Sequence, residues 1–272
     1  MHLKRWLTAI IALPILIYLI GFGPRWVFYL FLLLFSLAGL NEFYRLTLPD
    51  LPLVPKLATG FFVLAFFLIM YKGYLLILLS IISLVVIFPM LFFLFLDPMR
   101  GERYLSETGM MAAGFIYICL PIAMLIPIDN RLYFLQHGIR GIWIFFLLVV
   151  TFANDTGAFY GGKLFGKHKL YESVSPKKTW EGSIGGLFFA YIVAIAFLKI
   201  FRLHAIDLSI ILLIFLLSVA GQVGDLAESM LKRNFSVKDS GALLPGHGGI
   251  LDRIDSLLFA APVLYIFLMM TV

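Results

Sequence analysis

The sequence has little of what a soluble protein carries on its surface. Only 13% of its 272 residues are charged, whereas 62% are hydrophobic and the mean hydropathy is +1.03. The single cysteine, Cys119, lies in an apolar run, which excludes an internal disulfide and a cysteine zinc site. The sequence also lacks internal repeats, a low-complexity tail and a separate soluble domain. This composition excludes a soluble protein and predicts a polytopic membrane protein.

Long apolar runs divide the chain into segments of the length that a helix needs to cross about 30 Å of hydrocarbon. We therefore expect an all-α fold with about nine transmembrane helices. The third segment is the weakest and could join the fourth as a re-entrant pair. The first contains Pro14 and lacks a small-residue cleavage site, so we interpret it as a retained span rather than a signal peptide. The segments lie roughly at 6–22, 24–40, 57–72, 73–96, 107–128, 140–162, 182–201, 206–231 and 250–272.

Lysine and arginine are unevenly distributed between the two ends of these segments. If the N-terminus is cytoplasmic, 15 of the 21 basic residues lie on the cytoplasmic side. Cytoplasmic loops normally carry this excess, so the bias predicts a cytoplasmic N-terminus and an external C-terminus. The six basic residues on the other side are Arg25, Lys72, Arg131, Arg140, Lys199 and Arg202.

The first polar group of interest lies in the sixth segment. Asn154 and Asp155 follow a long apolar stretch, and an ionisable residue within a span is a functional candidate by default. The alternative is a carboxylate that reaches the membrane surface from a helix end. Gly157, Gly161 and Gly162 follow, and they would let another helix or a ligand approach closely.

A second group, SPKKTWEG, precedes the seventh segment at Ser175–Gly182. Lys177 and Lys178 supply positive charge, while Ser175 and Thr179 supply hydroxyl donors near a helix start, a combination that suits phosphate binding. A lysine pair at a membrane surface can also simply bind anionic headgroups or fix the topology.

Two further groups lie around the last two segments. Asp225, Glu228 and Lys232 share one face of a helix, although Glu228 and Lys232 could simply form an intrahelical ion pair. Asp252 and Asp255 are again three residues apart. Before them, His247-Gly248-Gly249 forms a turn whose amides could face an anion, or in which His247 is only structural. Carboxylates without a His/Cys ligand set suit a hard cation such as Mg²⁺.

The segment from Ser229 to Asp255 resembles the signature of the bacterial phosphatidate cytidylyltransferase (CDP-diacylglycerol synthase) family. The run at Ser175–Gly182 resembles a second motif of the same family. The matching signature positions are Ser229, Lys232, Arg233, Lys238, Asp239, Gly241, Leu244, Pro245, His247, Gly248, Gly249, Asp252, Arg253 and Asp255.

The resemblance implies an integral enzyme of the bacterial inner membrane that converts CTP and phosphatidate to CDP-diacylglycerol and pyrophosphate. It also implies membrane-lipid contacts and a homodimer, which the small-residue pair Gly182 and Gly186 supports weakly. We expect no nucleic-acid partner. The cofactor would be Mg²⁺, with room for a second cation.

Roles follow as hypotheses. Asp225 and Asp252 are the first choice as metal ligands, with Asp155, Asp255 and Glu228 as second choices. His247 would donate a proton or hydrogen bond to the leaving pyrophosphate. The expected catalytic residues are Asp225, Lys232, Arg233, Lys238, Asp239, His247, Asp252 and Arg253. The expected substrate-binding residues are Ser175, Lys177, Lys178, Thr179, Glu181, Gly248 and Gly249.

The polar groups divide the chain into two parts. Residues 1–135 show no chemistry and are expected to form a scaffold or a lipid-access route, whereas 136–272 form the catalytic part with cytoplasmic loops at 163–181 and 232–250. Two other functions stay open at this point. One is a CTP-dependent transferase with another lipid acceptor, and the other is a cation-coupled secondary transporter using Asp155 and Asp225.

Overall fold

The computed structural model describes residues 13–97, 103–130, 141–241 and 248–271. Eight helical segments among them are long and apolar enough to cross a membrane, by length and composition. The expectation of an all-helical polytopic membrane protein is therefore confirmed. The segments are α2 (Arg25–Thr47), α3 (Leu53–Lys72), the Ile77–Leu96 part of α4 (Leu75–Leu96), a composite segment over Arg103–Asp129, α9 (Ile142–Phe165), α10 (Trp180–Phe201), α11 (Leu208–Asn234) and α12 (Leu251–Met270).

The first predicted span, 6–22, lies partly outside the described residues, and 13–21 form a helix. The third and fourth predicted spans form two separate helices, α3 and α4, each of spanning length. Gly73 ends α3 in the left-handed conformation, at φ 77°, which glycine adopts without steric cost. At a rise of about 1.5 Å per residue, each of the two helices is about 30 Å long, enough to cross the hydrocarbon core.

The composite segment, which matches the fifth predicted span, consists of α5 (Arg103–Gly114), a π-helical turn at Phe115–Cys119, α6 (Leu120–Ala123) and α7 (Leu125–Asn130). Pro121 has no N–H to donate, and the irregular turn lies directly before it. Phe115, in this turn, packs edge-to-face on Phe66 of α3 with ring centroids 5.2 Å apart. Aromatic packing of this kind holds the N-terminal helices together.

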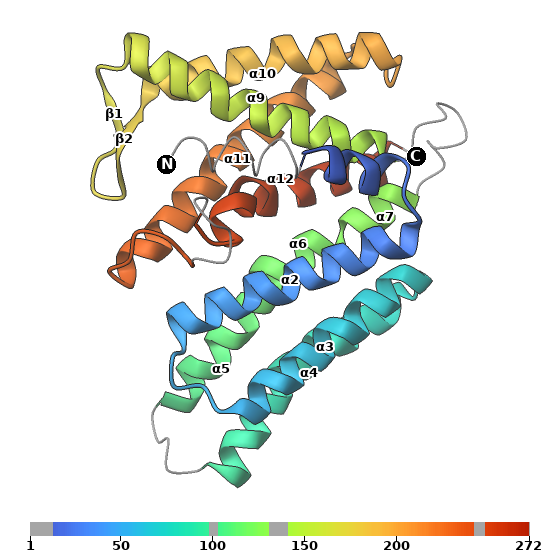
Figure 1. Ribbon diagram of the computed structural model, residues 1–272, viewed down its shortest axis with the longest axis vertical. Helices are drawn as coiled ribbons and strands as arrows, with labels where there is room; N and C mark the ends of the chain where they lie inside the picture. Colours follow the sequence, from blue (N-terminus) through green and yellow to red (C-terminus); the bar gives the residue numbers. More distant parts are fainter. Residues whose placement is uncertain (1–12, 98–102, 131–140, 242–247, 272) are drawn as a thin grey trace.

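Helix pairs follow one another across the molecule (Figure 1). The pair α9 and α10 lies at one side, followed by α11 and α12, then α2 with α5 to α7, and finally α3 and α4 at the other side. The end of α9 and the starts of α10 and α12 lie toward the same end of the bundle as the end of α11. The described parts of the polar segments singled out in the sequence therefore gather at one end.

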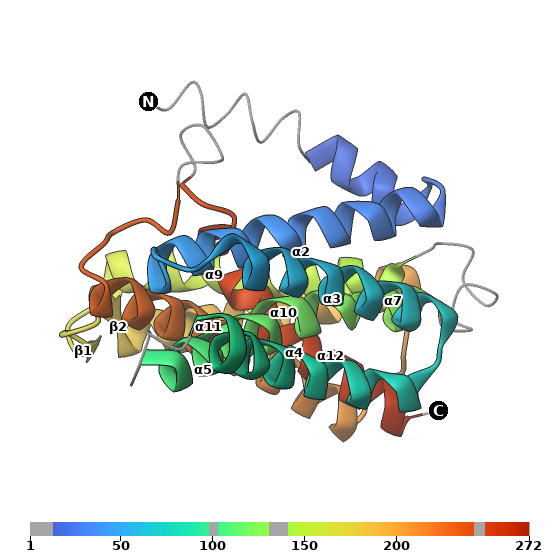
Figure 2. The same ribbon diagram turned by 90° about the horizontal axis from the view of Figure 1, so that it is seen from below.

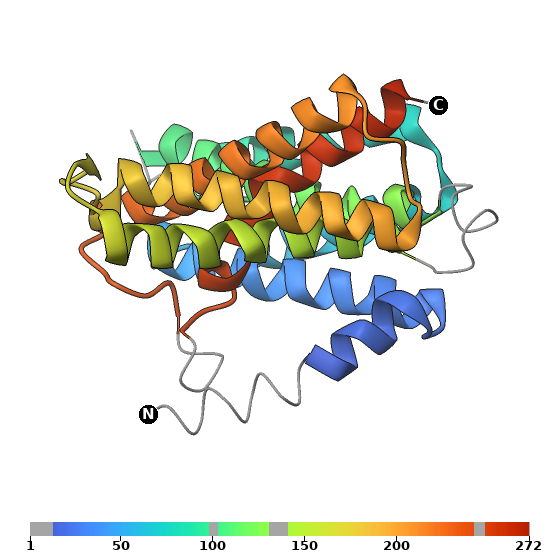
Figure 3. The ribbon, with the colours of Figure 1, turned by 90° about the horizontal axis from the view of Figure 1, so that it is seen from above.

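A short antiparallel hairpin extends beyond the paired ends of α9 and α10 (Figures 2 and 3). Its strands are β1 (Lys169–Tyr171) and β2 (Ser175–Thr179). Thr179 ends β2 and caps α10, since its side-chain oxygen accepts a hydrogen bond from the Gly182 N–H at 3.1 Å. The hairpin lies in the expected loop 163–181. Because its strands are lysine-rich and very short, the sequence shows no strand-like alternation there.

Candidate active site

Glycines bring α9 and α10 into backbone contact. A Cβ atom at Gly161 would lie 3.3 Å from the Cα atom of Gly185, and one at Gly157 would lie 3.0 Å from the Cα atom of Gly186. The expected close helix approach at Gly157 and Gly161 is thus confirmed, and the approaching helix is α10 of the same chain. Gly182 and Gly186, which offered weak support for a homodimer, face α9 within the chain.

A partly buried amide network joins α9, α10 and α11 close to Asp155 and Asp225. The Gln222 Nε2 group in α11 donates to Asn154 Oδ1 of α9 at 2.9 Å and to the Ser183 carbonyl of α10 at 3.0 Å. The Ser183 hydroxyl donates to Gln222 Oε1. Asn154 is only 1% exposed, so these bonds satisfy groups that would be costly to bury alone. The network fixes the helix turns that carry Asp155 and Asp225.

Asp155, Asp225 and Asp255 form a carboxylate cluster with one member from each of α9, α11 and α12. Their carboxyl groups lie close enough to interact electrostatically across the helix interfaces. The close approach of α11 and α12 contributes, since a Cβ atom at Gly224 would lie 2.5 Å from the Asp255 carbonyl oxygen. Lys178 of β2 reaches the cluster, and its Nζ atom lies 2.8 Å from Asp225 Oδ2. The hairpin therefore adds a cation to an acidic site.

A second group, the lysine centre, consists of Glu228, Lys232 and Asp252. The Lys232 Nζ atom lies 2.7 Å from Asp252 Oδ1 and also forms an ion pair with Glu228. Asp252 Oδ2 accepts hydrogen bonds from the Ser240 N–H at 3.0 Å and the Gly249 N–H at 2.8 Å. The Glu228 side chain is 1% exposed and that of Asp252 is 9% exposed, so this ion-pair network is largely removed from solvent.

Glu181 has a local partner set at the start of α10. Its carboxylate accepts hydrogen bonds from the backbone N–H groups of Lys167 and His168, and the His168 ring lies 2.6 Å from Glu181 Oε1. These contacts close the turn between α9 and β1. The predicted role of Glu181 in substrate binding stays a prediction.

The other predicted residues lie around this end of the bundle. Arg233 donates through Nε to the Val174 carbonyl at 3.4 Å and so ties α11 to the hairpin. Lys177, Lys238, Asp239 and Arg253 are exposed, and Ser175 is half-buried in β2. Gly248 adopts a positive φ of 82°. His247 lies outside the described residues.

The site's chemistry suits a hard divalent cation. The three carboxyl groups of the cluster outnumber the single Lys178 ammonium group that pairs with it. No three His, Cys, Asp or Glu side chains form a ready-made metal site within the described part of the chain. Mg²⁺ usually takes one or two carboxylates together with water and phosphate oxygens, so this arrangement fits an ion that binds along with a nucleotide.

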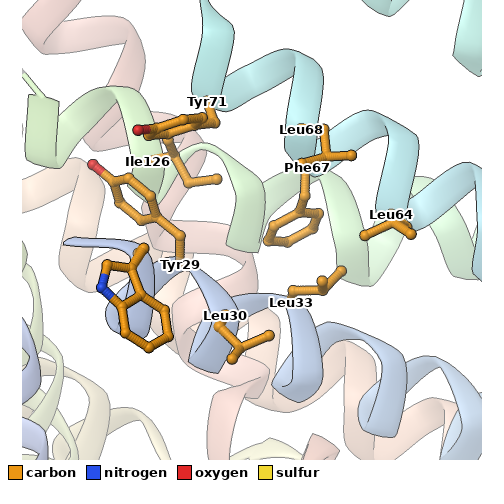
Figure 4. Close-up of a pocket in the computed structure, with 9 residues that line it drawn as sticks. Tyr29, Leu30, Leu33, Leu64, Phe67, Leu68, Tyr71 and Ile126 are labelled. Atoms are coloured by element: carbon orange, nitrogen blue, oxygen red, sulfur yellow. The ribbon is translucent and has the colours of Figure 1, made fainter. Parts of the chain in front are cut away.

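A separate cavity of about 340 Å³ lies between α2, α3 and α7 (Figure 4). Its lining is apolar and aromatic, and none of the predicted site residues contributes to it. Such a surface suits hydrocarbon and offers no charge to a phosphate. The lining residues are Trp26, Tyr29, Leu30, Leu33, Leu64, Phe67, Leu68, Tyr71 and Ile126.

Comparison with known proteins covers almost the whole chain. The model of the cytidylyltransferase family matches residues 3–271. A phosphatidate cytidylyltransferase of Staphylococcus haemolyticus is 38% identical over 264 residues, which cover 97% of this chain and 98% of that protein. The enzyme of the same name from Staphylococcus epidermidis is 36% identical over 268 residues, covering 98% and 99%. That of Bacillus subtilis is 44% identical over 163 residues, covering 60% and 59%. The similarity thus includes both the apolar and the polar helices.

Proposed function

This chain belongs to the cytidylyltransferase family, and from that premise we propose that it transfers the cytidylyl group of CTP to phosphatidate. A phosphate oxygen of phosphatidate attacks the α-phosphorus of CTP. The bond from the α-phosphorus to the bridging oxygen breaks, and pyrophosphate leaves. The products are CDP-diacylglycerol, which stays in the bilayer, and pyrophosphate. The chain is a multi-pass membrane protein, so its lipid substrate and its lipid product lie in the same bilayer as the protein.

One observation carries this proposal beyond the family match. The carboxylates of three helices and the lysines of α11 and the hairpin gather at one end of the bundle. A site for two phosphate substrates needs both signs of charge, because cations bind the phosphates and carboxylates hold a metal ion.

The reaction requires neutralisation of phosphate charge more than it requires acid–base catalysis. A phosphomonoester has its second pKa near 6, so the attacking oxygen is mostly ionised at pH 7. Two anionic reactants repel each other, and the protein must hold them in line. In our proposal Lys178, with Ser175, Lys177 and Thr179, closes over the CTP phosphates. Lys232, Arg233, Lys238 and Arg253 hold phosphates of both substrates, and His247 assists the leaving pyrophosphate.

We assign Mg²⁺ to Asp225 and Asp252, with Asp155, Asp255 and Glu228 nearby as further ligands or partners of a second cation. The ion would offset phosphate charge and polarise the phosphorus centre. Asp225 shares the carboxylate cluster, whereas both oxygens of Asp252 already accept hydrogen bonds. Asp252 Oδ1 accepts one hydrogen bond, from Lys232, so a lone pair of Oδ1 would be left for a metal ion.

The proposal extends to the setting of the enzyme. We place it in the bacterial inner membrane with its N-terminus and its polar end in the cytoplasm, where CTP is available. A homodimer is part of the proposal. Because Gly182 and Gly186 are covered by α9, the dimer contact must use another surface.

The proposal is tested with purified protein in detergent, Mg²⁺ and CTP, by comparing acceptors under identical conditions. We expect CDP-diacylglycerol and pyrophosphate to form in equal amounts with phosphatidate, and no product after chelation of the metal. Matched reactions contain a prenyl alcohol or an ether-linked lipid in place of phosphatidate. Faster transfer to either of these, in protein shown to be folded, would contradict the assignment of the acceptor.

A further inference from the structure

Glu42 is a buried carboxylate in the part of the chain expected to be only a scaffold. It lies near the end of α2 and is 5% exposed. A charged group in such a place is costly unless it has hydrogen-bond partners. Its partners are residues of the signature segment, 198 and 209 positions further along the chain. The contact thus joins the two parts of the molecule at the active site.

The first partner is the start of α12. Glu42 Oε2 accepts a hydrogen bond from the Leu251 N–H at 3.1 Å, and Leu251 is the first residue of α12. The first N–H groups of a helix have no acceptor within the helix, and the N-cap residue Ile250 offers no side-chain cap. Glu42 therefore caps α12 from another helix and places a negative charge at its positive end.

The second partner connects Glu42 to Asp252. The Ser240 Oγ atom lies 3.3 Å from Glu42 Oε2 and 3.1 Å from Asp252 Oδ2. A serine hydroxyl has one proton, so it donates to one of these two carboxylates at a time. The Ser240 N–H also donates to Asp252 Oδ2 at 3.0 Å. A substitution of Glu42 would therefore alter the hydrogen bonding of Asp252 through Ser240, which contacts both carboxylates.

Two glycines make room for the Glu42 carboxyl group. A Cβ atom at Gly241 would lie 2.8 Å from Glu42 Cδ, and one at Gly249 would lie 2.5 Å from Glu42 Oε2. Real Cβ atoms essentially never approach other atoms so closely, so an alanine at either position would displace the carboxyl group or the backbone. Glycine at 241 thus leaves space for the Glu42 side chain, and glycine at 249 leaves space for Glu42 together with Ser240.

We propose that Glu42 is a positioning residue for cytidylyl transfer. Its carboxylate holds Ser240 and the first turn of α12, and through them it holds the Asp252 side chain. The N-terminal helices then contribute one hydrogen-bond acceptor to the active site in addition to their packing. This inference rests on the proposed function, because the group that Glu42 positions belongs to that site.

The test compares Glu42→Ala and Glu42→Gln with the wild type. The alanine variant loses the acceptor, and a small displacement of reacting groups can lower a rate about 100-fold, so we expect kcat to fall by about that factor. The glutamine variant keeps a carbonyl oxygen for Leu251 and Ser240, and we expect its kcat within about 5-fold of the wild type. The KM for phosphatidate should change little in either variant.

The matched control is Ser36→Ala, which alters another buried polar residue of α2, earlier in the helix than Glu42. We expect its kcat to equal that of the wild type. A kcat for folded Glu42→Ala within about 3-fold of the wild type would overturn the inference. Equal losses in the alanine and glutamine variants would also overturn it, because glutamine keeps the hydrogen-bond acceptor on which the proposal depends.

Two further measurements keep the test decisive. If Glu42→Ala does not fold, Glu42→Gln and Ser240→Ala are combined, and the effects on kcat should be non-additive because both variants act on one shared hydrogen bond. Strict additivity would contradict the proposal. Hydrogen exchange at Leu251, which needs no substrate, should be faster in Glu42→Ala than in the wild type. The wild-type rate tests the proposed function, whereas the variant-to-wild-type ratio and the exchange test Glu42, so the two failures are distinguishable.

Discussion

The N-terminal helices, from α2 to the π-helical turn after α5, and the C-terminal helices α9 to α12 are held together by different kinds of contact. The former interlock through aromatic side chains such as Phe66 and Phe115. At the polar end the latter meet through glycines and a partly buried amide network around Gln222, while aromatic rings such as Phe146 and Phe197 pack them at the other end. Large apolar side chains fill space and tolerate lipid, whereas backbone contact and hydrogen bonds fix helix turns accurately. The second arrangement occurs around the charged side chains of the proposed site.

The strongest test of this contrast is Asp252→Asn. The substitution removes a carboxylate that contacts Lys232, Ser240 and Gly249, and with it a predicted metal ligand. Electrostatic contributions of this kind are worth about 10²–10³-fold in kcat, and we expect a loss of at least that order. The measurement is label transfer from CTP by folded protein. The control is Asp207→Asn, which alters the N-cap of α11, at the opposite end of the helix from Lys232. It should leave kcat unchanged, since asparagine also caps helices. Near-normal turnover of Asp252→Asn would remove Asp252 from the mechanism.

Lys178→Met should have the next largest effect. The variant leaves Asp225 without its ion pair and removes a cation from the proposed CTP site. Because charge-assisted hydrogen bonds contribute about 1.5–3 kcal/mol, we expect kcat/KM for CTP to fall by about 10- to 100-fold. Initial rates at varied CTP concentration measure it. The matched control is Lys199→Met, which alters a lysine in the last turn of α10, at the end of that helix away from the hairpin. Equal effects of the two lysine variants would show that the contact with Asp225 does not matter.

The difference between a glycine at a helix contact and one in open space can be tested by measuring the free energy of unfolding alone. Gly157→Ala would place a Cβ atom 2.6 Å from Phe189 Cβ, and we expect the free energy of unfolding to drop by about 1–3 kcal/mol. Gly109→Ala, in α5, meets nothing within 4 Å and should stabilise the protein by about 0.5–1 kcal/mol through helix propensity. Thermal unfolding in detergent measures both. A stabilising Gly157→Ala would mean that α9 and α10 are not in backbone contact.

The smallest effect is expected at the apolar cavity. The Tyr29 hydroxyl donates to the buried Asp129 Oδ2 at 2.9 Å, so Tyr29→Phe removes a hydrogen bond from a buried carboxylate. We expect a loss of about 1–2 kcal/mol in stability with no change in kcat. Thermal unfolding and label transfer measured on one preparation separate the two quantities. A large loss of kcat here would mean that chemistry is not confined to one end of the molecule.

Much of this architecture could be predicted from local sequence. Apolar length places eight spans closely, because crossing the hydrocarbon core constrains helix length directly. The residue types of the site could also be predicted, since ionisable groups next to apolar helices stand out. The Glu228–Lys232 ion pair follows from helix periodicity and is present.

The pairings between elements could not be predicted in this way. Nothing local connects Lys178 with Asp225, or Asn154 with Gln222, because these contacts depend on how the helices pack. Glu42 is the clearest case. A single acidic residue near the end of an apolar helix looks like a membrane-boundary charge, and its partners lie about two hundred positions away. The β1–β2 hairpin was missed because its strands are too short to show a period.

The central claim is that the polar end of α9 to α12 transfers a cytidylyl group and not a phosphoryl group. The most direct test supplies phosphatidate and Mg²⁺ to two parallel reactions, one with CTP labelled at the α-phosphorus and one with CTP labelled at the γ-phosphorus. The account predicts that the α-label moves into the lipid phase, while the γ-label stays in water as pyrophosphate. Transfer of the γ-label to lipid, or no transfer of either label by folded protein that binds CTP, would contradict it.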